Sequence, residues 1–386
     1  MKKFYAALLV ACCVLSSALT AASSPAQTLQ VVLDQFIVAN PTIPGVMVSL
    51  QSDRLDLSWQ GASGVADITT AAQMAADQPL RLASTTKTYV AAATLRLIEM
   101  GKLDLNDTLD KLLPKRQLAI LKRGSYKPKT ITVRHLLTHT SGIWDFAQSD
   151  AYVEVVSADP NHRWTRDEQL EFTVDRGQPY GAAGEYYHYS DGGYILLGEI
   201  IERRSRLGLA AALRKLLKFR QLGLKATWLE ILEPEPRNIP ARAHQYFGDL
   251  DTNGWDASLD LYGGGGLVAN MPDLAKFFAA LFRGEVFDRA STLTTMLTSV
   301  IPHYGGPNTG KPGYGEHQYC LGVYATEYRG YTMFQHGGFW GTRGVYVPAL
   351  DLALAMAVTQ QQSRQQQVQL FKSILDVIID AQVETK

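Results

Sequence analysis

The chain has 386 residues, of which 46% are hydrophobic, 10% aromatic and 19% charged. This composition is typical of a globular enzyme and excludes a disordered or collagen-like chain. Basic and acidic residues number 37 each, so the formal net charge is zero. No excess of basic residues indicates a nucleic-acid partner. The length fits two domains or one large two-lobed unit.

The N-terminal segment differs in pattern from the rest of the chain. A short basic start precedes an apolar run over residues 4–19, and small residues follow it. This order predicts a signal peptide over 1–22, with cleavage possible up to Ala26, and an exported bacterial protein, periplasmic or secreted. The apolar run is shorter than a membrane span requires, so we expect no span in the mature chain. The residues up to Cys12 resemble a lipoprotein box, which leaves a lipid anchor there as an alternative.

The predicted elements begin with a helix over about 26–38, where apolar residues recur at helical spacing. Residues 46–50 and 55–59 follow as two strands of a hairpin. A second apolar helix then starts at Ser84 and ends near Gly101.

From about residue 103 to 284 the pattern is mostly helical, with long loops. The run Gly263–Gly266 lacks the ending of a phosphate loop, so we expect tight backbone packing there. Asn270 should cap the next helix. Cys320 would be the one cysteine left after signal cleavage, which excludes an intrachain disulfide and favours a buried apolar role.

Strands return at the C-terminal end, over 331–335, 344–347 and 352–358. The last of them alternates large apolar residues with alanine, as expected of an interior strand covered on both faces. A closing helix should follow, because apolar residues recur at helical spacing after the Gln-rich turn. They are Val368, Phe371, Leu375 and Ile378.

Ser84-Thr85-Thr86-Lys87 places a hydroxyl and an amine three residues apart at a helix start. Residues with this spacing share one helix face, so the amine can reach the hydroxyl and act as its base. This arrangement activates a serine without histidine. A chain of this length contains roughly one S-x-x-K by chance, so the motif needs partners elsewhere.

Two later motifs supply those partners. Tyr189-Ser190-Asp191 and His336-Gly337-Gly338 follow in that order, and a Leu-Leu-Thr-His-Thr-Ser-Gly run over 136–142 lies before them. Together they resemble the serine β-lactamase and penicillin-recognising family, whose marks are S-x-x-K, Y-x-N and K-T-G or H-x-G. The resemblance covers roughly residues 28–360 and includes class C lactamases, D-alanyl-D-alanine carboxypeptidases and related esterases.

Strands at both ends and helices between them agree with the fold that this resemblance implies. We expect a mixed α/β (α+β), β-lactamase/transpeptidase-like fold, in which helices flank an antiparallel sheet and a mainly helical domain is inserted. The catalytic unit would occupy 27–386. Its α/β part would span about 27–83 and 315–386, and its helical part about 84–314.

The resemblance implies that Ser84 attacks a carbonyl and forms an acyl-enzyme, without cofactor or metal. Lys87 and Tyr189 would move its proton, Lys87 as a partly neutral amine and Tyr189 as a phenol shuttle or a phenolate. Because their protons are coupled, the sequence does not assign the base to either residue.

The third motif would form an edge strand beside the cleft, where Gly337 and Gly338 let a substrate backbone approach. The resemblance implies an oxyanion hole from the N–H groups of Ser84 and Phe339. His336 stands where lactamases usually have lysine. It would orient the tyrosine or bind a substrate carboxylate, with a charge that depends on pH.

Asp191 departs from the family pattern, which has asparagine there. A carboxylate cannot donate a hydrogen bond to a substrate carbonyl, and beside Lys87 it would favour the charged amine. We therefore expect a serine hydrolase for a D-Ala peptide, a small ester or a β-lactam, with carboxypeptidase or esterase activity favoured over lactamase activity. A weak or inactive penicillin-binding or regulatory protein is the alternative.

Other motifs favour no competing chemistry. His135 and His139 are spaced like zinc ligands, but no glutamate stands where a zinc protease needs one, and the resemblance implies structural roles. The pair Asp145 and Asp191 has no spacing that supports a glycosidase. No G-x-S-x-G motif indicates an α/β-hydrolase.

Overall fold

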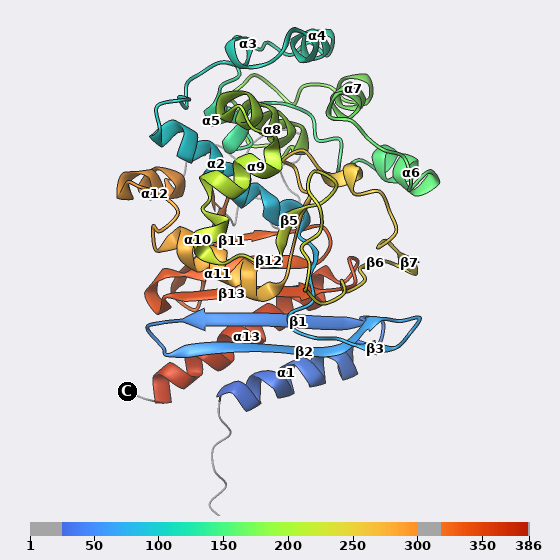
Figure 1. Cartoon of the computed structure of the whole chain (residues 1–386), viewed down its shortest axis with the longest axis vertical. Helices are drawn as coiled ribbons and strands as arrows, with labels where there is room; N and C mark the ends of the chain where they lie inside the picture. Colours follow the sequence, from blue (N-terminus) through green and yellow to red (C-terminus); the bar gives the residue numbers. More distant parts are fainter. Residues whose placement is uncertain (1–24, 299–317, 385–386) are drawn as a thin grey trace, which may run out of the picture.

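The computed structural model describes residues 25–298 and 318–384. The predicted signal peptide, Cys12 and the expected domain boundary at 314/315 lie outside the described residues. Figure 1 shows two helices below a sheet and a larger helical region above it. No helix within the described ranges is both long and apolar enough to cross a membrane.

The main sheet is built from both ends of the chain. β1 (Gly45–Ser52) pairs antiparallel with β2 (Leu57–Asp67) on one side and with β13 (Leu352–Val358) on the other. The predicted hairpin is therefore confirmed, with longer strands than expected. The strand order is β3-β2-β1-β13-β12-β11-β10-β9. The remaining strands of this sheet are β3 (Ala72–Gln73), β9 (Gln318–Tyr319), β10 (Tyr324–Tyr328), β11 (Tyr331–Gly337) and β12 (Thr342–Val347).

The alternation along β13 explains how the sheet is covered. Its large apolar residues face α1 (Pro25–Ala39) and α13 (Arg364–Glu384), whereas its alanines face α11 (Met271–Phe282). The small alanine side chains let α11 lie close to the sheet. The prediction of an interior strand covered on both faces is confirmed, as is the closing helix, although Val368 on that helix is 39% exposed.

The part of the chain between the N-terminal and the C-terminal strands of the sheet is mainly helical. Its central helix is α2 (Thr86–Glu99), which packs against α8 (Asp191–Ser205). A small sheet of β4 (Leu80–Arg81), β8 (Leu267–Ala269) and β5 (Thr227–Leu229) leads into α2. The other elements are α3 (Leu109–Leu112), α4 (Lys115–Arg123), α5 (Val133–Leu137), α6 (Asp150–Ala158), α7 (Arg166–Arg176), α9 (Leu209–Leu216), α10 (Phe219–Leu222), α12 (Ala290–Leu297), β6 (Tyr246–Phe247) and β7 (Leu250–Asp251).

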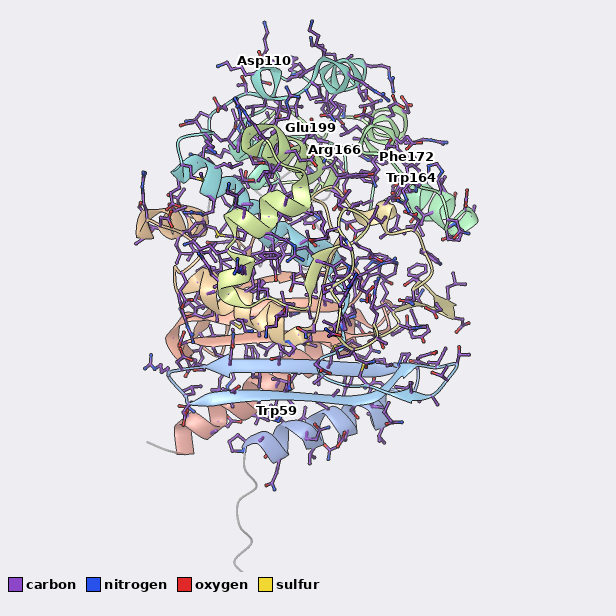
Figure 2. The ribbon with its side chains drawn as sticks, viewed as in Figure 1. Trp59, Asp110, Trp164, Arg166, Phe172 and Glu199 are labelled. Carbon is purple, nitrogen blue, oxygen red and sulfur yellow. The ribbon has the colours of Figure 1, made fainter. Side chains whose placement is uncertain are left out.

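An ion-pair cluster holds α8 in place within this region. Arg166 at the start of α7 binds Glu199 of α8 at 2.6 Å and Glu202 at 2.9 Å, and Figure 2 shows Arg166 and Glu199 close together. Nearby, Trp164 packs edge-on against Phe172. These contacts fix the helix whose first residue is Asp191, a predicted site residue.

Two local expectations can be compared directly with the structure. The side chain of Asn270 accepts a hydrogen bond from the Asp273 N–H at 2.8 Å, so the predicted cap is confirmed. The helix that it caps, α11, falls within the expected helical part but packs against β1, β12 and β13. The sheet layer therefore includes α11, because the flat alanine face of β13 needs an apolar cover.

Glu99, the last residue of α2, forms hydrogen bonds with residues around the start of α12. The buried Glu99 carboxylate accepts the N–H groups of Asp288 and Arg289 and the Thr292 hydroxyl. Glu99→Gln replaces an acceptor oxygen with a donor, so we expect the free energy of unfolding to fall by about 1–3 kcal/mol at pH 7. Urea denaturation would measure it, with the exposed Glu285→Gln as the control.

The same variant has an expected pH dependence. Burial raises the pKa of Glu99, but its hydrogen bonds outweigh burial and bring that pKa below the ordinary 4.5. The stabilisation is therefore fully present above the unfolded pKa and is lost as pH falls through the lower native pKa. The stability difference between wild type and Glu99→Gln should shrink in acid. An unchanged difference at pH 7 and pH 3 would contradict this account.

Candidate active site

Ser84 lies in a 3₁₀ turn, Ala83–Thr85, directly before α2. Ala83 has a left-handed φ of 46°, a conformation that non-glycine residues rarely adopt. The turn is held from the other side of the cleft, because Thr342 donates a hydrogen bond to the Leu82 carbonyl at 2.7 Å. At Gly338, an added Cβ would lie 2.1 Å from that same carbonyl. Glycine is thus required where the third motif meets the serine turn.

Lys87 is fully buried beneath Ser84 and points its amine at three acceptors. Its Nζ lies 2.9 Å from Ser84 Oγ and 2.6 Å from the Gly264 carbonyl, and it forms an ion pair with Asp191 Oδ1. An ammonium has three N–H donors and no acceptor. With all three donors in use, charged Lys87 has no lone pair that could take the Ser84 proton.

The Gly263–Gly266 run makes this contact possible. Gly263 and Gly266 have φ values of 123° and 104°. A Cβ on Gly264 would lie 2.7 Å from Asp191 Oδ1, and one on Gly265 would lie 2.1 Å from Asp260 Oδ1. The expectation of tight backbone packing is borne out. This close packing lets the Gly264 carbonyl accept a hydrogen bond from Lys87.

Tyr189 lies on the open side of Ser84. Lys87 Nζ is 4.9 Å from the centroid of its ring. Burial and the neighbouring Asp191 carboxylate raise the pKa of Tyr189 well above 10, although a hydrogen bond from Ser84 acts in the opposite direction. The phenol therefore stays protonated near neutral pH, and it lines the same cavity as Ser84.

Three carboxylates surround the amine. Asp145 accepts the N–H of Asp191 at 3.0 Å, and burial followed by repulsion from Asp191 raises the pKa of Asp145 to about 7. Burial and Asp191 likewise raise the pKa of Asp260 to about 6. Because Lys87 has one positive charge, it offsets only one of these groups. The site therefore disfavours full ionisation of all three carboxylates near neutral pH.

His336 belongs to a chain of hydrogen bonds behind the site. Its Nδ1 lies 2.9 Å from the Gly337 carbonyl, which can only accept, so Nδ1 is protonated. Its Nε2 then accepts from the Tyr319 hydroxyl at 3.4 Å. Burial and the charge of Lys87 lower the pKa of His336 to about 3. The ring is therefore neutral at neutral pH, because it is buried and both nitrogens already have partners.

The chain continues to His139. The Ser190 N–H donates to His139 Nδ1 at 3.1 Å, so Nε2 is protonated and donates to the Tyr319 hydroxyl at 3.1 Å. Burial lowers the pKa of His139 well below 6.5. His139 thus links the second and third motifs as a neutral connector. His135 has a separate role, because its Nδ1 accepts the Thr132 N–H at a helix start.

The backbone geometry agrees with the expected oxyanion hole. The N–H groups of Ser84 and Phe339 have no hydrogen-bond acceptor among the residues described here. Both residues line the same cavity. Their two N–H groups therefore remain available to a ligand oxygen, as stabilisation of an oxyanion requires.

A cavity of about 500 Å³ lies over these groups. All eight predicted site residues meet there: Lys87 supports Ser84 from below, and the others line the cavity. Residues from two segments, 144–159 with α6 and 241–262 with β6 and β7, form much of the remaining wall. The most prominent of their lining residues are Phe146, Tyr152, Phe247, Trp255 and Asp260.

Sequence reasoning missed several residues that complete the site. Tyr319 and Asp260 carry no motif, and Tyr319 comes near His139 only through the fold. The role of Gly264 depends on its carbonyl, which every residue type possesses. The glycine run itself was the one signal that could have indicated a close backbone approach there.

Comparison with known sequences now adds to this geometry. The model of the Beta-lactamase family matches residues 33–377. Penicillin-binding protein 4* of Bacillus subtilis (strain 168) is 26% identical over 254 residues, which are 61% of this chain and 52% of that protein. Esterase EstB of Burkholderia gladioli is 29% identical over 232 residues, covering 57% of this chain and 55% of the esterase. The chain thus spans about half the length of these curated relatives.

Solved structures give the same fold over a larger share of the chain. D-amino acid amidase from Ochrobactrum anthropi SV3, complexed with L-phenylalanine amide, has a TM-score of 0.76 at 23% identity, covering 93% of this chain and 100% of the amidase. EstCE1, a hydrolase with promiscuous acyltransferase activity, has a TM-score of 0.68 at 20% identity, covering 91% and 98%. These likenesses confirm the predicted β-lactamase/transpeptidase-like fold. With the family match over 33–377, they establish that the chain belongs to the Beta-lactamase family of serine hydrolases.

Proposed function

We propose that this protein hydrolyses an ester or amide bond through an acyl-enzyme on Ser84. The observation that carries the proposal is the 2.9 Å hydrogen bond from Lys87 Nζ to Ser84 Oγ at the base of a cavity that Tyr189 also lines. A serine hydroxyl that is held by a neighbouring amine and faces a cavity is arranged for nucleophilic attack. The unoccupied N–H groups of Ser84 and Phe339 supply the oxyanion hole.

Tyr189 carries the proton in this mechanism. As Ser84 Oγ attacks the carbonyl carbon, its hydrogen passes to Tyr189 Oη, and the phenol hydrogen passes to the leaving-group atom. The tyrosine gains and loses a proton in one sequence and never has to exist as a free phenolate. This route agrees with the raised pKa of Tyr189, while Lys87 stays an ammonium that holds Ser84 Oγ.

Deacylation reverses the same path. A water molecule attacks the acyl carbonyl and gives one hydrogen to Tyr189 Oη, and the phenol hydrogen returns to Ser84 Oγ. The acid product leaves with the water oxygen, and the site returns to its starting protonation state. No cofactor takes part in this balance.

The position of Asp191 favours esters over β-lactams. Its carboxylate is paired with Lys87 and can only accept hydrogen bonds, so it offers no donor to a substrate amide carbonyl. The relatives named as an esterase and a D-amino acid amidase are compatible with this preference. The basic and apolar segment over 1–22 supports an exported location, which N-terminal sequencing of the mature protein would test.

The central test is Ser84→Ala assayed with a chromogenic acetate ester, a D-Ala-D-Ala peptide and a cephalosporin. We expect the wild type to cleave the ester or the peptide and the variant to lose that turnover by more than about 1,000-fold. Intact-protein mass after a fluorophosphonate probe should show one adduct, located on the Ser84 peptide. Full activity in the variant would exclude this mechanism. Absence of both adduct and turnover in the wild type would favour the inactive penicillin-binding alternative.

Tyr189→Phe removes the proposed shuttle and keeps the ring beside Lys87. We expect kcat for the ester to fall by about 10²–10⁴-fold with little change in KM. The wild-type kcat should not rise between pH 8 and pH 10 as a phenolate base would require, because the pKa of Tyr189 lies well above 10. Stopped-flow and steady-state rates would check both results.

The control for this variant is Tyr187→Phe, which removes a nearby hydroxyl that contacts Tyr324 at 3.1 Å. We expect this change to alter kcat less than about threefold, since the hydroxyl has no contact with Ser84. Equal losses in the two variants would argue against a shuttle specific to Tyr189.

Asp191→Asn supplies the amide donor that the family pattern contains. We expect the acylation rate with a cephalosporin, divided by the rate with the ester, to rise by about tenfold or more. Asp260→Asn removes a neighbouring carboxylate without altering the partner of Lys87, so it controls for charge alone. An unchanged ratio in Asp191→Asn would show that the missing donor does not limit β-lactam acylation.

A further inference from the structure

Tyr319 is a fully buried tyrosine that belongs to none of the three motifs. It lies on β9, and its hydroxyl is 3.1 Å from His139 Nε2 and 3.4 Å from His336 Nε2. His139 comes from the run over 136–142, and His336 begins the third motif. A buried hydroxyl needs hydrogen-bond partners. Here both partners are histidine side chains from segments that are far apart in the chain.

The hydrogen bonds through Tyr319 all run in one direction. The Ser190 N–H donates to His139 Nδ1 at 3.1 Å, so the hydrogen of that ring is on Nε2 and points to the Tyr319 oxygen. The Tyr319 hydroxyl then donates to His336 Nε2, and His336 Nδ1–H donates to the Gly337 carbonyl at 2.9 Å. Burial lowers the pKa of both histidines, so each ring is neutral and has one donor and one acceptor.

Both ends of this series are backbone groups, and this determines what the series can do. A peptide N–H only donates a hydrogen bond, and a carbonyl only accepts one. A proton that moved through the series would have to leave the Ser190 amide or remain on the Gly337 carbonyl, and neither group titrates near neutral pH. The series is therefore suited to holding two backbone segments together and not to proton transfer.

The two segments that it holds carry groups of the proposed mechanism. Ser190 directly follows Tyr189, whose ring centroid lies 4.2 Å from that of His139. Gly337 is the last residue of β11 and lies two positions before Phe339, which offers its N–H to the oxyanion. The series thus connects the segment of the proton shuttle with the segment of the oxyanion hole.

We propose that Tyr319 is a positioning residue that fixes the placement of Tyr189 relative to the Phe339 N–H. This inference rests on the proposed function of Ser84 and adds a residue from outside the motifs. Catalysis is sensitive to such placement, because a displacement of about 1 Å can lower a rate by about 100-fold. Tyr319 is fully buried, so it acts on the rate through the residues that it holds. Its loss should therefore slow acylation without weakening substrate binding.

The test compares Tyr319→Phe with Tyr194→Phe in the full chain. Tyr194 is the matched control because it is equally buried, its hydroxyl lies 3.4 Å from that of Tyr319, and it donates to the Leu137 carbonyl at 3.0 Å. Each variant loses a buried hydroxyl, so both should show a lower Tm. Only Tyr319→Phe should lower kcat for the ester by about 10- to 100-fold, with KM changed less than about twofold. Tyr194→Phe should change kcat by less than about threefold.

Nitrogen NMR of protein labelled with ¹⁵N-histidine checks the series without substrate. We expect His139 to carry its hydrogen on Nε2 and His336 to carry its hydrogen on Nδ1, and His336→Gln would assign the His336 signals. In Tyr319→Phe the Nε2 signal of His336 should shift, because this nitrogen loses its donor. In Tyr194→Phe the signal should stay in place. A hydrogen on the other nitrogen of either ring would overturn the series.

The rate at which a fluorophosphonate labels Ser84 provides a readout that does not require turnover. Labelling should be slower in Tyr319→Phe than in wild type or Tyr194→Phe, as followed by intact-protein mass. Equal losses in the two tyrosine variants would overturn the positioning role. Slower labelling confined to Tyr319→Phe, in a protein that hydrolyses no ester or peptide, would support the role of Tyr319 and contradict the proposed hydrolysis. Absence of labelling and of turnover in the wild type would contradict both.

Discussion

The buried ammonium of Lys87 is the interaction on which the site depends. It joins three segments that are far apart in the chain: the start of α2, the start of α8 and the glycine run before β8. An ammonium removed from water is strongly unfavourable unless charge and hydrogen bonds replace its hydration. The three segments must therefore close on it together. Gly264 is needed because any larger residue would meet the Asp191 carboxylate.

This arrangement determines which groups are free for chemistry. Lys87 directs one donor at Ser84 Oγ, and Tyr189 lines the cavity that Ser84 also faces. The His139–Tyr319–His336 series lies behind the site and consists of neutral groups with assigned donors and acceptors. It fixes the third motif without adding a titrating charge. The site thus contains the Lys87–Asp191 ion pair in front of a series of neutral groups.

The cavity above this centre is walled largely by residues outside the motifs. Relatives with the same fold are named as a penicillin-binding protein, an esterase and an amidase, so the fold alone does not select a substrate. Here the wall comes from two segments, 144–159 and 241–262, and from the end of the sheet. Asp260 and Arg343 both line this wall, and neither forms an ion pair with another described residue. Such charges select among substrates because a wrong ligand leaves them unpaired.

The sequence by itself determined the order of the elements and the identity of the motif residues. Strands and helices were predicted from apolar residues that recur at period two or at helical spacing. The Asn270 cap and the end of the second helix near Gly101 were predicted from single residues. All of these features depend on local chain geometry, which sequence patterns report directly. The Ser84–Lys87 pair was also local, because three residues on a helix fix its geometry. Bounds were less certain, since strands such as β2 lengthen when a neighbour supplies hydrogen bonds.

Only the tertiary structure decided the long-range partners. The Gly264 carbonyl, Tyr319 and the packing of α11 on the sheet depend on contacts between distant segments, and no local pattern records them. The neutral state of His336 was also decided there, because burial and two hydrogen bonds override the ordinary pKa of imidazole. The same reason applies to Arg343. Its residue type is visible in the sequence, but only the folded neighbourhood shows that no described acidic residue forms an ion pair with it.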